Sequence, residues 1–367
     1  MKLTRIAQLG AVAAIAALAL TGCASNEGGT GGPTPTDSAT VLTGTLAGSG
    51  ATSQQVAVQS WTSLIQTANP DLTVTYDPQG SGTGRESFQQ GAVQFAGSDR
   101  AFKADEITAG PFTACAADSD LVEIPAYISP IAIIFNVEGV DSLNLDPETL
   151  AGIFAGKITK WNDAKIAATN EGVSLPDLAI SPVHRSDKSG TTGNFTDYLS
   201  ATGGSQWTFG SVEEWPIQGG EAAQGTSGVV NAVKGGKGTI GYADSSQAGD
   251  LASVKVQVGS EWVGHSAEGA SKAADVSPFE EGRAATDLAI KIDRTTTEAG
   301  AYPVLLISYL IGCVEYEDAT FAPLVKGFFS TAISAEGQES AATNAGSAPI
   351  SDELRTKAQA AIDAIKG

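Results

Sequence analysis

The sequence of 367 residues predicts an α/β fold. Segments with strand periodicity alternate along the chain with segments of helical periodicity, which is the order expected of α/β proteins. Glycine and hydroxyl residues recur in the turns between them. The body of the chain, from about residue 41 to 367, is long enough for two domains.

Apolar segments with alternating or β-branched residues predict five strands, at residues 42–46, 72–76, 93–96, 125–137 and 179–184. The segment 125–137 (PAYISPIAIIFNV) is apolar almost throughout. We therefore interpret it as a fully buried strand of a parallel sheet.

Helical spacing of apolar residues follows most of these strands. Residues 57–65 carry one apolar face until Asn69-Pro70 ends the pattern. Asp146-Pro147-Glu148 predicts the start of another helix, with Asp146 as N-cap and proline in the first turn. Residues 195–199 continue the pattern after the strand at 179–184.

Residues 1–22 have the form of a lipoprotein signal peptide. Lys2 and Arg5 precede an apolar run that is too short to span a bilayer and is typical of secretory signals. The run ends in Leu-Thr-Gly-Cys, which resembles the lipobox of bacterial lipoproteins, so Cys23 is expected to carry an acyl chain such as palmitate. Residues 23–40 then read as a flexible tether, and the protein is expected on the extracytoplasmic face of the cell membrane.

Two cysteines remain once Cys23 is assigned to the anchor. Cys115 and Cys313 belong to a chain exported to an oxidising compartment, which favours a disulfide between them. Two buried free thiols are the alternative, and spacing alone does not decide between these possibilities.

The composition disfavours nucleic-acid and metal sites. A formal net charge of -20 makes nucleic acid a poor partner. The two histidines, His184 and His265, lack a Cys-x-x-Cys motif or other ligand cluster nearby, so neither a transition metal nor another cofactor is expected.

A glycine and hydroxyl turn before a helix start recurs in the chain. It is found around Thr52 and Ser53, at Ser81, at Ser189-Gly190-Thr191 and again at 225–228. The first turn of a helix offers unpaired N–H groups and a partial positive charge, which together bind anions. Arg185 adds a planar set of donors suited to phosphate or carboxylate, and Asp187 is expected to orient it.

Five motifs, in order, resemble the phosphate-binding lipoprotein (PstS-type) of the Pst ABC phosphate importer, particularly its actinobacterial forms. They are GSGATS at 48–53, QGSGTGRESFQQGAVQFAGSD at 79–99, LDPETLAGIFAGKITKWND at 145–163, HRSDKSGTT at 184–192 and GGKGTIGYAD at 235–244. The resemblance covers most of the chain after residue 41.

The resemblance implies a two-lobed periplasmic-binding-protein fold of type II, with mixed sheets flanked by helices and a ligand cleft at the hinge. Lobe 1 would comprise residues 41–128 and 306–367, and lobe 2 residues 129–305. The positions that match the family's phosphate ligands are Thr52, Ser53, Ser81, Asp99, Arg185, Ser189, Gly190 and Thr191. Because the family often has an aromatic residue where Ser53 stands, the backbone N–H of Ser53 is the more expected donor.

The same resemblance implies a function. The protein would be a monomer and not an enzyme, and it would capture inorganic phosphate by hinge closure. A separate membrane permease would then take up the phosphate. Asp99 would set specificity, because an ionised carboxylate can only accept a hydrogen bond, and phosphate near neutral pH keeps a proton that sulfate lacks. Mismatches of this kind can discriminate by roughly four to five orders of magnitude.

Features of the sequence suggest three alternative functions. The segment 187–191 (DKSGT) is similar to the phosphorylation motif of P-type ATPases, but the chain lacks the long apolar runs that such pumps need. A secreted phosphatase, with Ser189 as nucleophile in the same cradle, is the nearer alternative, although no activating base stands out. A surface adhesin could coexist with transport.

Overall fold

The structure, a computed structural model, describes residues 41–367. The predicted signal peptide at 1–22, the tether at 23–40 and the lipid anchor at Cys23 lie outside the described residues. Within residues 41–367 no helix is both long and apolar enough to cross a membrane.

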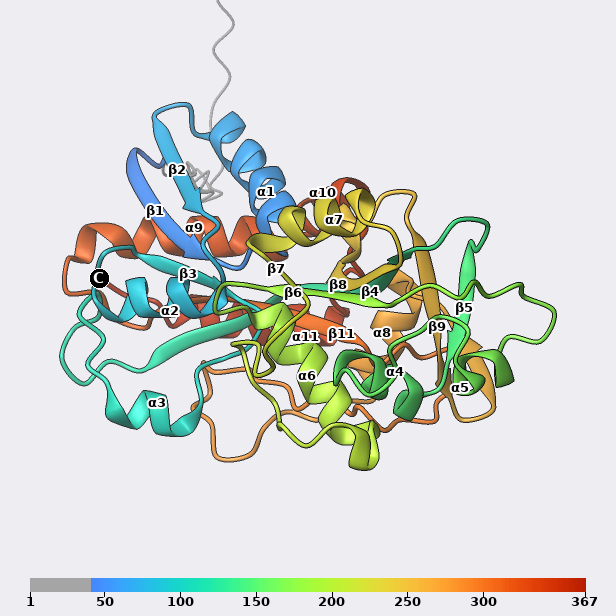
Figure 1. The fold of residues 1–367 in the computed structure, drawn as a ribbon. Coiled ribbons are helices and arrows are strands. Elements are labelled where there is room, and N and C mark those ends of the chain that lie inside the picture. The colour runs from blue at the N-terminus through green and yellow to red at the C-terminus, as the bar shows by residue number, and fades with distance from the viewer. Residues whose placement is uncertain (1–40) are drawn as a thin grey trace, which may run out of the picture. The chain divides into compact units, whose positions relative to one another are not determined.

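Strands and helices alternate through most of the described chain (Figure 1). The strands are β1 (Gly44–Gly50), β2 (Leu72–Asp77), β3 (Phe95–Ser98), β4 (Leu121–Asn136), β5 (Ser142–Leu145), β6 (Ser181–Arg185), β7 (Glu221–Ala223), β8 (Thr239–Asp244), β9 (Ala252–Val258), β10 (Glu261–Val263) and β11 (Leu305–Cys313). The helices are α1 (Gln55–Ala68), α2 (Ser81–Gln89), α3 (Ala104–Ala109), α4 (Pro147–Phe154), α5 (Ala164–Ala168), α6 (Gly190–Thr202), α7 (Gly225–Gly235), α8 (Ala267–Asp275), α9 (Ala322–Ile333), α10 (Ala335–Ala345) and α11 (Asp352–Asp363).

The strands form a mixed sheet in the order β2-β1-β3-β11-β4-β8-β6-β7, with β9 pairing β4, β5 and β10. Strand β1 is parallel to β2 and β3, and β6 is parallel to β7 and β8. The α/β class and the mixed, helix-flanked sheet are therefore confirmed.

Strand β4 runs through the middle of the sheet and changes partner along its length. Residues 121–130 pair antiparallel with β11, and residues 131–136 pair antiparallel with β8. The prediction of a buried strand is confirmed, because every residue of β4 except Asn136 is buried. The prediction of a parallel sheet around it is wrong. An apolar run indicates that both faces of the strand are buried. Helices and loops can cover both faces whatever the direction of the neighbouring strands.

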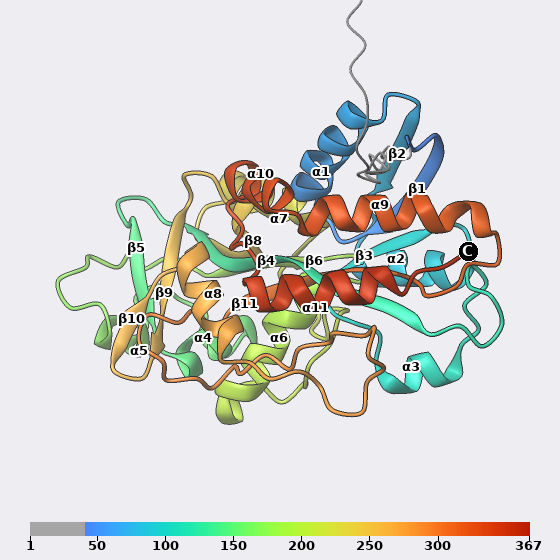
Figure 2. The same ribbon diagram turned by 180° about the vertical axis from the view of Figure 1, so that it is seen from behind.

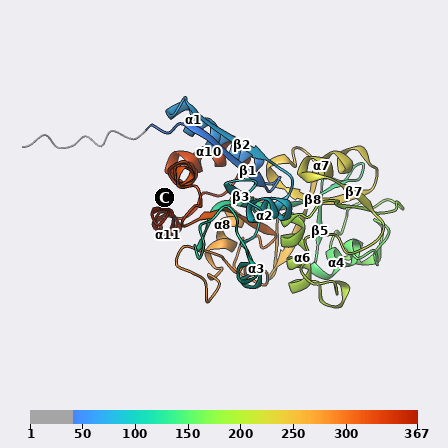
Figure 3. The ribbon, with the colours of Figure 1, turned by 90° about the vertical axis from the view of Figure 1, so that its left-hand side faces the viewer.

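The ends of the described chain lie together. Helices α1, α9 and α10 contact one another, α11 packs on α9, and Trp61 of α1 donates to the Gly337 carbonyl at 3.0 Å. Figure 2 shows α9 and α11 running side by side in front of the sheet. In Figure 3 the blue start and red end lie on one side, and the green and yellow middle of the chain lies on the other.

Strand β1 is longer than predicted. The prediction ended it at residue 46, whereas the strand continues to Gly50 and pairs with β3 up to Gly97. Gly50 has a φ of +152°, and a Cβ there would lie 1.9 Å from the Gly97 carbonyl oxygen. Only glycine lets the two strands approach this closely, so a glycine-rich segment that reads as a turn is a strand end.

Other local predictions hold. Helix α4 begins at Pro147, and the Asp146 side chain accepts a hydrogen bond from the Thr149 N–H. Cys115 and Cys313 form a disulfide, which links the segment after α3 to the end of β11. The alternative of two free thiols is thereby excluded.

Candidate functional site

Asp99 lies at the end of β3 and connects three of the segments singled out from the sequence. Its Oδ1 accepts from the Ser53 hydroxyl at 2.6 Å, and its Oδ2 accepts from the Thr191 hydroxyl at 3.0 Å. Its own N–H donates to the Ser81 Oγ at 3.1 Å. The turns before α1, α2 and α6 therefore meet around one residue, Asp99, which is only 2% exposed.

Burial raises the pKa of Asp99, because an ionised carboxylate loses its hydration there. Hydrogen bonds from the Ser53 and Thr191 hydroxyls and the charge of Arg185 oppose this increase. An anionic ligand placed beside Asp99 would increase the cost of its charge further unless that ligand donated a proton to it.

Arg185 ends β6 and is also 2% exposed. Its Nε donates to the Asp187 Oδ1 at 2.7 Å, and its Nη2 pairs with Oδ2 of the same carboxylate. The Gly225 N–H, at the start of α7, donates to the Asp187 Oδ1 at 3.0 Å. Burial acts to raise the pKa of Asp187, but the bonds and charge of Arg185 outweigh it and lower that pKa. The Asp187 carboxylate is thus ionised at neutral pH and holds the guanidinium in one orientation.

Helix α6 points its N-terminus at the same place. The Ser189 side chain caps this helix by accepting from the Thr192 N–H at 3.1 Å, and Thr191 binds Asp99. A Cβ on Gly190 would lie 2.4 Å from the Ser81 Oγ and 2.7 Å from the Asp99 Cβ. The starts of α2 and α6 are therefore in direct contact, and the Gly82 N–H of α2 donates to the Lys188 carbonyl just before α6 at 3.1 Å. Two helix starts, each with a partial positive charge, thus lie next to one another.

Thr52 makes its contact with a residue that the sequence analysis left out of the site. Its hydroxyl lies 2.9 Å from the Thr226 hydroxyl and accepts from the Thr226 N–H at 3.2 Å. Thr226 starts α7 within the turn at 225–228, the fourth copy of the glycine and hydroxyl pattern. The signal was therefore visible, but only the fold brings it next to Thr52.

Asn194 and Tyr242 also support the site without having been predicted. The Asn194 Nδ2 donates to the Asp99 carbonyl at 2.6 Å and to the Gly190 carbonyl at 3.0 Å. The Tyr242 hydroxyl lies 2.7 Å from the Thr192 hydroxyl and accepts from the Arg185 N–H at 3.3 Å. Asn194 lies one helical turn after Gly190, which is a weak signal, and Tyr242 had none beyond its place in the GGKGTIGYAD motif.

The remaining candidates lie around this cluster. His184 stacks on Trp215 at 5.1 Å between ring centroids, and both of its ring nitrogens lie within hydrogen-bond distance of backbone carbonyls. Lys188 forms a solvent-exposed ion pair with Glu86 at 2.6 Å. No group of His, Cys, Asp and Glu in residues 41–367 is arranged to hold a metal ion.

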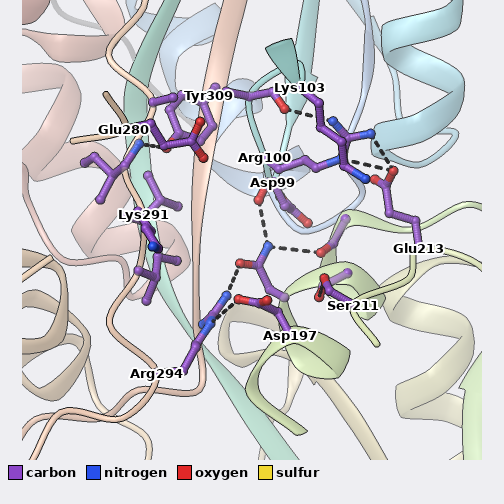
Figure 4. A pocket seen from close by; sticks show the side chains of 18 of the residues that line it. Asp99, Arg100, Lys103, Asp197, Ser211, Glu213, Glu280, Lys291, Arg294 and Tyr309 are labelled. Carbon is purple, nitrogen blue, oxygen red and sulfur yellow. Dashed lines mark hydrogen bonds and ion pairs between the residues drawn. The ribbon is translucent and has the colours of Figure 1, made fainter. Parts of the chain in front are cut away.

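A cleft of about 1140 Å³ opens beside the cluster. Asp99, Gly190 and Asn194 contribute to one wall, together with Arg100 and Glu213 (Figure 4). Residues 289–295 also line the cleft, and the Arg294 Nη2 donates to the Asn194 Oδ1 at 2.5 Å. Charged groups of both signs line the cleft, whereas the cluster beside it combines hydroxyl groups, N–H groups, one guanidinium and one acceptor carboxylate. That set of groups can hold a small tetrahedral oxyanion that carries a proton.

Comparisons with known proteins agree with this chemistry. The model of the PBP superfamily domain matches residues 33–336. The chain is 33% identical to phosphate-binding protein PstS 3 of Mycobacterium tuberculosis (strain ATCC 25618 / H37Rv), over 100% of both chains. It is 31% identical to phosphate-binding protein PstS of Xylella fastidiosa (strain Temecula1 / ATCC 700964), over 77% of this chain and 76% of the relative.

Solved structures share the fold. A high-affinity periplasmic phosphate-binding protein (PfluDING), solved with phosphate bound, superposes with a TM-score of 0.70 at 24% sequence identity. The match covers 86% of this chain and 93% of that one.

Proposed function

The chain belongs to the PstS-type phosphate-binding proteins of the PBP superfamily, and from this membership and the geometry of the site we propose that it captures inorganic phosphate for an ABC permease. The proposal depends mainly on one observation: Asp99 is buried, accepts hydrogen bonds from two hydroxyl groups and lies close to Arg185. Its carboxylate provides an acceptor in a site that otherwise offers donors.

Asp99 would select phosphate over sulfate. Phosphate can donate its proton to the Asp99 carboxylate, whereas sulfate has only acceptors and would meet an unpaired buried charge. The bound phosphate would replace the hydroxyl contacts that Ser53 and Thr191 now make with Asp99, or would share them.

The remaining phosphate oxygens would be held by Thr52, the backbone N–H of Ser53, Ser81, Arg185, Ser189, Gly190 and Thr191. Contact between the starts of α2 and α6, and between Thr52 and the start of α7, supports this set. Fixed N–H groups at contact distance outweigh the net charge of -20, because surface charge is screened over about 8 Å at physiological salt.

Two lobes would close over the ligand. We assign residues 41–128 and 306–367 to lobe 1 and residues 129–305 to lobe 2, with crossings near Ser129 and Tyr302. The exchange of partner on β4 between Pro130 and Ile131 supports the first crossing, and the start of β11 at Leu305 supports the second. In this assignment the bond between Thr52 and Thr226 joins the lobes and indicates a closed state.

The protein would act as a monomer outside the cytoplasmic membrane, held there by the lipid on Cys23, with a separate permease as its partner. It is not proposed as an enzyme. A phosphatase needs a nucleophile next to a general base, but the Ser189 hydroxyl accepts from its own helix and Asp187 is paired with Arg185.

The test is calorimetry. The full-length chain, purified in mild detergent and stripped of carried-over ligand, is titrated with phosphate and then with sulfate at neutral pH. We expect tight binding of phosphate at a single site and no detectable sulfate binding. Equal binding of both anions, or steady hydrolysis of a chromogenic phosphate ester, would overturn the proposal.

A further inference from the structure

We propose that Glu213 is a positioning residue that latches the two lobes in the phosphate-bound state by pairing with Arg85 and Arg100. The inference rests on the proposed function and its lobe assignment. Glu213 lies between α6 and β7, in lobe 2, whereas Arg85 of α2 and Arg100 after β3 belong to lobe 1.

One oxygen of the Glu213 carboxylate accepts hydrogen bonds from both arginines. The Glu213 Oε2 accepts from the Arg85 Nη2 at 2.6 Å and from the Arg100 Nη2 and Nε at 2.8 and 3.1 Å. Figure 4 shows the Arg100 and Glu213 side chains pointing toward one another on the wall of the cleft. Neither arginine is among the residues that the sequence analysis assigned to the ligand.

The backbone of Glu213 is tied to the phosphate cradle. Its carbonyl accepts from the Ser189 N–H at 3.0 Å, at the residue that caps α6. The adjoining Val212 N–H donates to the Thr196 hydroxyl at 2.9 Å, which fastens the segment to the next turn of the same helix. Glu213 therefore joins the start of α6 through its main chain to the opposite lobe through its side chain.

The environment of this contact makes it stronger than a surface ion pair. The side chains of Arg85 and Glu213 are 3% and 12% exposed, so water screens them little. Burial acts to raise the pKa of Glu213, but the two arginines outweigh it and lower that pKa, so the latch stays charged at neutral pH.

Opening of the lobes would separate Glu213 from Arg85 and Arg100 and would expose their charges to solvent. The latch therefore acts on the stability of the closed state, and hence on the rate at which phosphate leaves. Removing one partner of a buried charge pair leaves the other unpaired, and such changes act mainly on dissociation rates.

The test uses the full-length chain in mild detergent, loaded with radiolabelled phosphate and chased with unlabelled phosphate. For Glu213→Gln we expect release about 10- to 100-fold faster than in the wild type, with an association rate that changes far less. Arg100→Gln should accelerate release less, because Glu213 then keeps its pair with Arg85. The double variant Glu213→Gln/Arg100→Gln should release phosphate no faster than Glu213→Gln alone, because the single variant has already lost the pair of Glu213 with Arg100.

The matched control is Glu214→Gln, which removes the same charge from the next residue, an exposed position on the same cleft. Its release rate should equal that of the wild type. A purely structural role for Glu213 would lower the melting temperature of the phosphate-free variant and leave release unchanged, which would overturn the latch. If the wild type itself binds no phosphate, the proposed function fails and the latch with it.

Discussion

At the residue scale, the candidate site contains a buried carboxylate, Asp99, and a partly buried one, Asp187, whose pKa values are shifted in opposite directions. Burial raises the pKa of Asp99, while the pKa of Asp187 is lowered because the bonds and charge of Arg185 outweigh its burial. The Asp187 carboxylate is therefore paired with Arg185, whereas the Asp99 carboxylate can accept a hydrogen bond from a protonated ligand. The sequence identified both residues, but only the structure shows that their environments differ.

Replacing Asp99 tests the basis of selectivity. In Asp99→Asn the negative charge is lost, so sulfate no longer meets repulsion there, and we expect discrimination between phosphate and sulfate to fall by at least about 100-fold. Competition calorimetry at neutral pH measures this ratio. Asp77→Asn, at the exposed end of β2, should leave it unchanged. The selectivity mechanism fails if Asp99→Asn rejects sulfate as strongly as the wild type does.

Asp244 provides a pH prediction independent of the ligand. It is fully buried, and burial raises its pKa from 3.8 to about 6. Between these values the folded state holds a proton that the unfolded state has released, so this group makes the protein less stable as pH rises through that range. The effect amounts to about 3 kcal/mol, at 1.36 kcal/mol per pKa unit.

The measurement is urea unfolding of Asp244→Asn and the wild type at about pH 4 and about pH 7.5. Because asparagine does not ionise, the variant should gain stability relative to the wild type as the pH rises. The exposed Asp250→Asn should show no such trend. A difference between Asp244→Asn and wild type that does not depend on pH would contradict the assignment.

At the element scale, the candidate site is formed where helix N-termini meet. The starts of α2 and α6 touch through Ser81 and Gly190, and the start of α7 reaches Thr52 and Asp187. Local sequence predicted each start, because glycine, hydroxyl and capping residues act over a few positions. It did not predict that the turn at 225–228 belongs with the others, since that depends on contacts between distant segments.

Gly190→Ala tests this close approach. An added Cβ would clash with Ser81 and Asp99 only when the two helix starts are together, because position 190 itself has helical geometry. Overpacking of this kind costs about 1–3 kcal/mol, so we expect phosphate affinity to fall about 10- to 100-fold. Calorimetry gives the affinity, and the melting temperature of the phosphate-free variant should not fall.

Gly228→Ala is the control for that change. It lies in α7, where a Cβ would meet its nearest atoms at an ordinary 3.6 Å. Phosphate affinity should stay within about twofold of the wild type, since no closing contact is blocked. Equal affinity of Gly190→Ala and Gly228→Ala for phosphate would mean that the starts of α2 and α6 do not need to meet.

At the scale of the whole molecule, long-range links hold the halves of the chain in place. Strand β4 pairs with both β11 and β8, and the disulfide joins Cys115 to Cys313, 198 residues apart in the sequence. The composition supported an exported chain with a disulfide, whereas the antiparallel partners of β4 could not be predicted. Strand direction depends on where β8 and β11 return, and a buried apolar run is compatible with either direction.

Removing the disulfide should destabilise the fold without changing the site. Loop-closure entropy predicts a loss of about 5 kcal/mol at most for a loop of this length in Cys115→Ala/Cys313→Ala. Urea unfolding should show a lower midpoint, and reduction of the wild type should shift it in the same direction. Phosphate affinity should persist, because neither cysteine is a site residue. An unchanged midpoint would show that the bond adds little to stability.

The sequence by itself determined the fold class and the starts of α1, α2, α4, α6 and α7, because periodicity, capping and glycine turns act within short segments. The candidate ligand residues came from the resemblance to the PstS-type family. Only the tertiary structure decided that β4 is antiparallel to its neighbours, that Thr226, Asn194 and Tyr242 support the site, and that Glu213 meets Arg85 and Arg100. These contacts join residues from about 50 to more than 100 positions apart along the chain, and such pairs are set by packing and by the path of the chain, which local propensity does not encode.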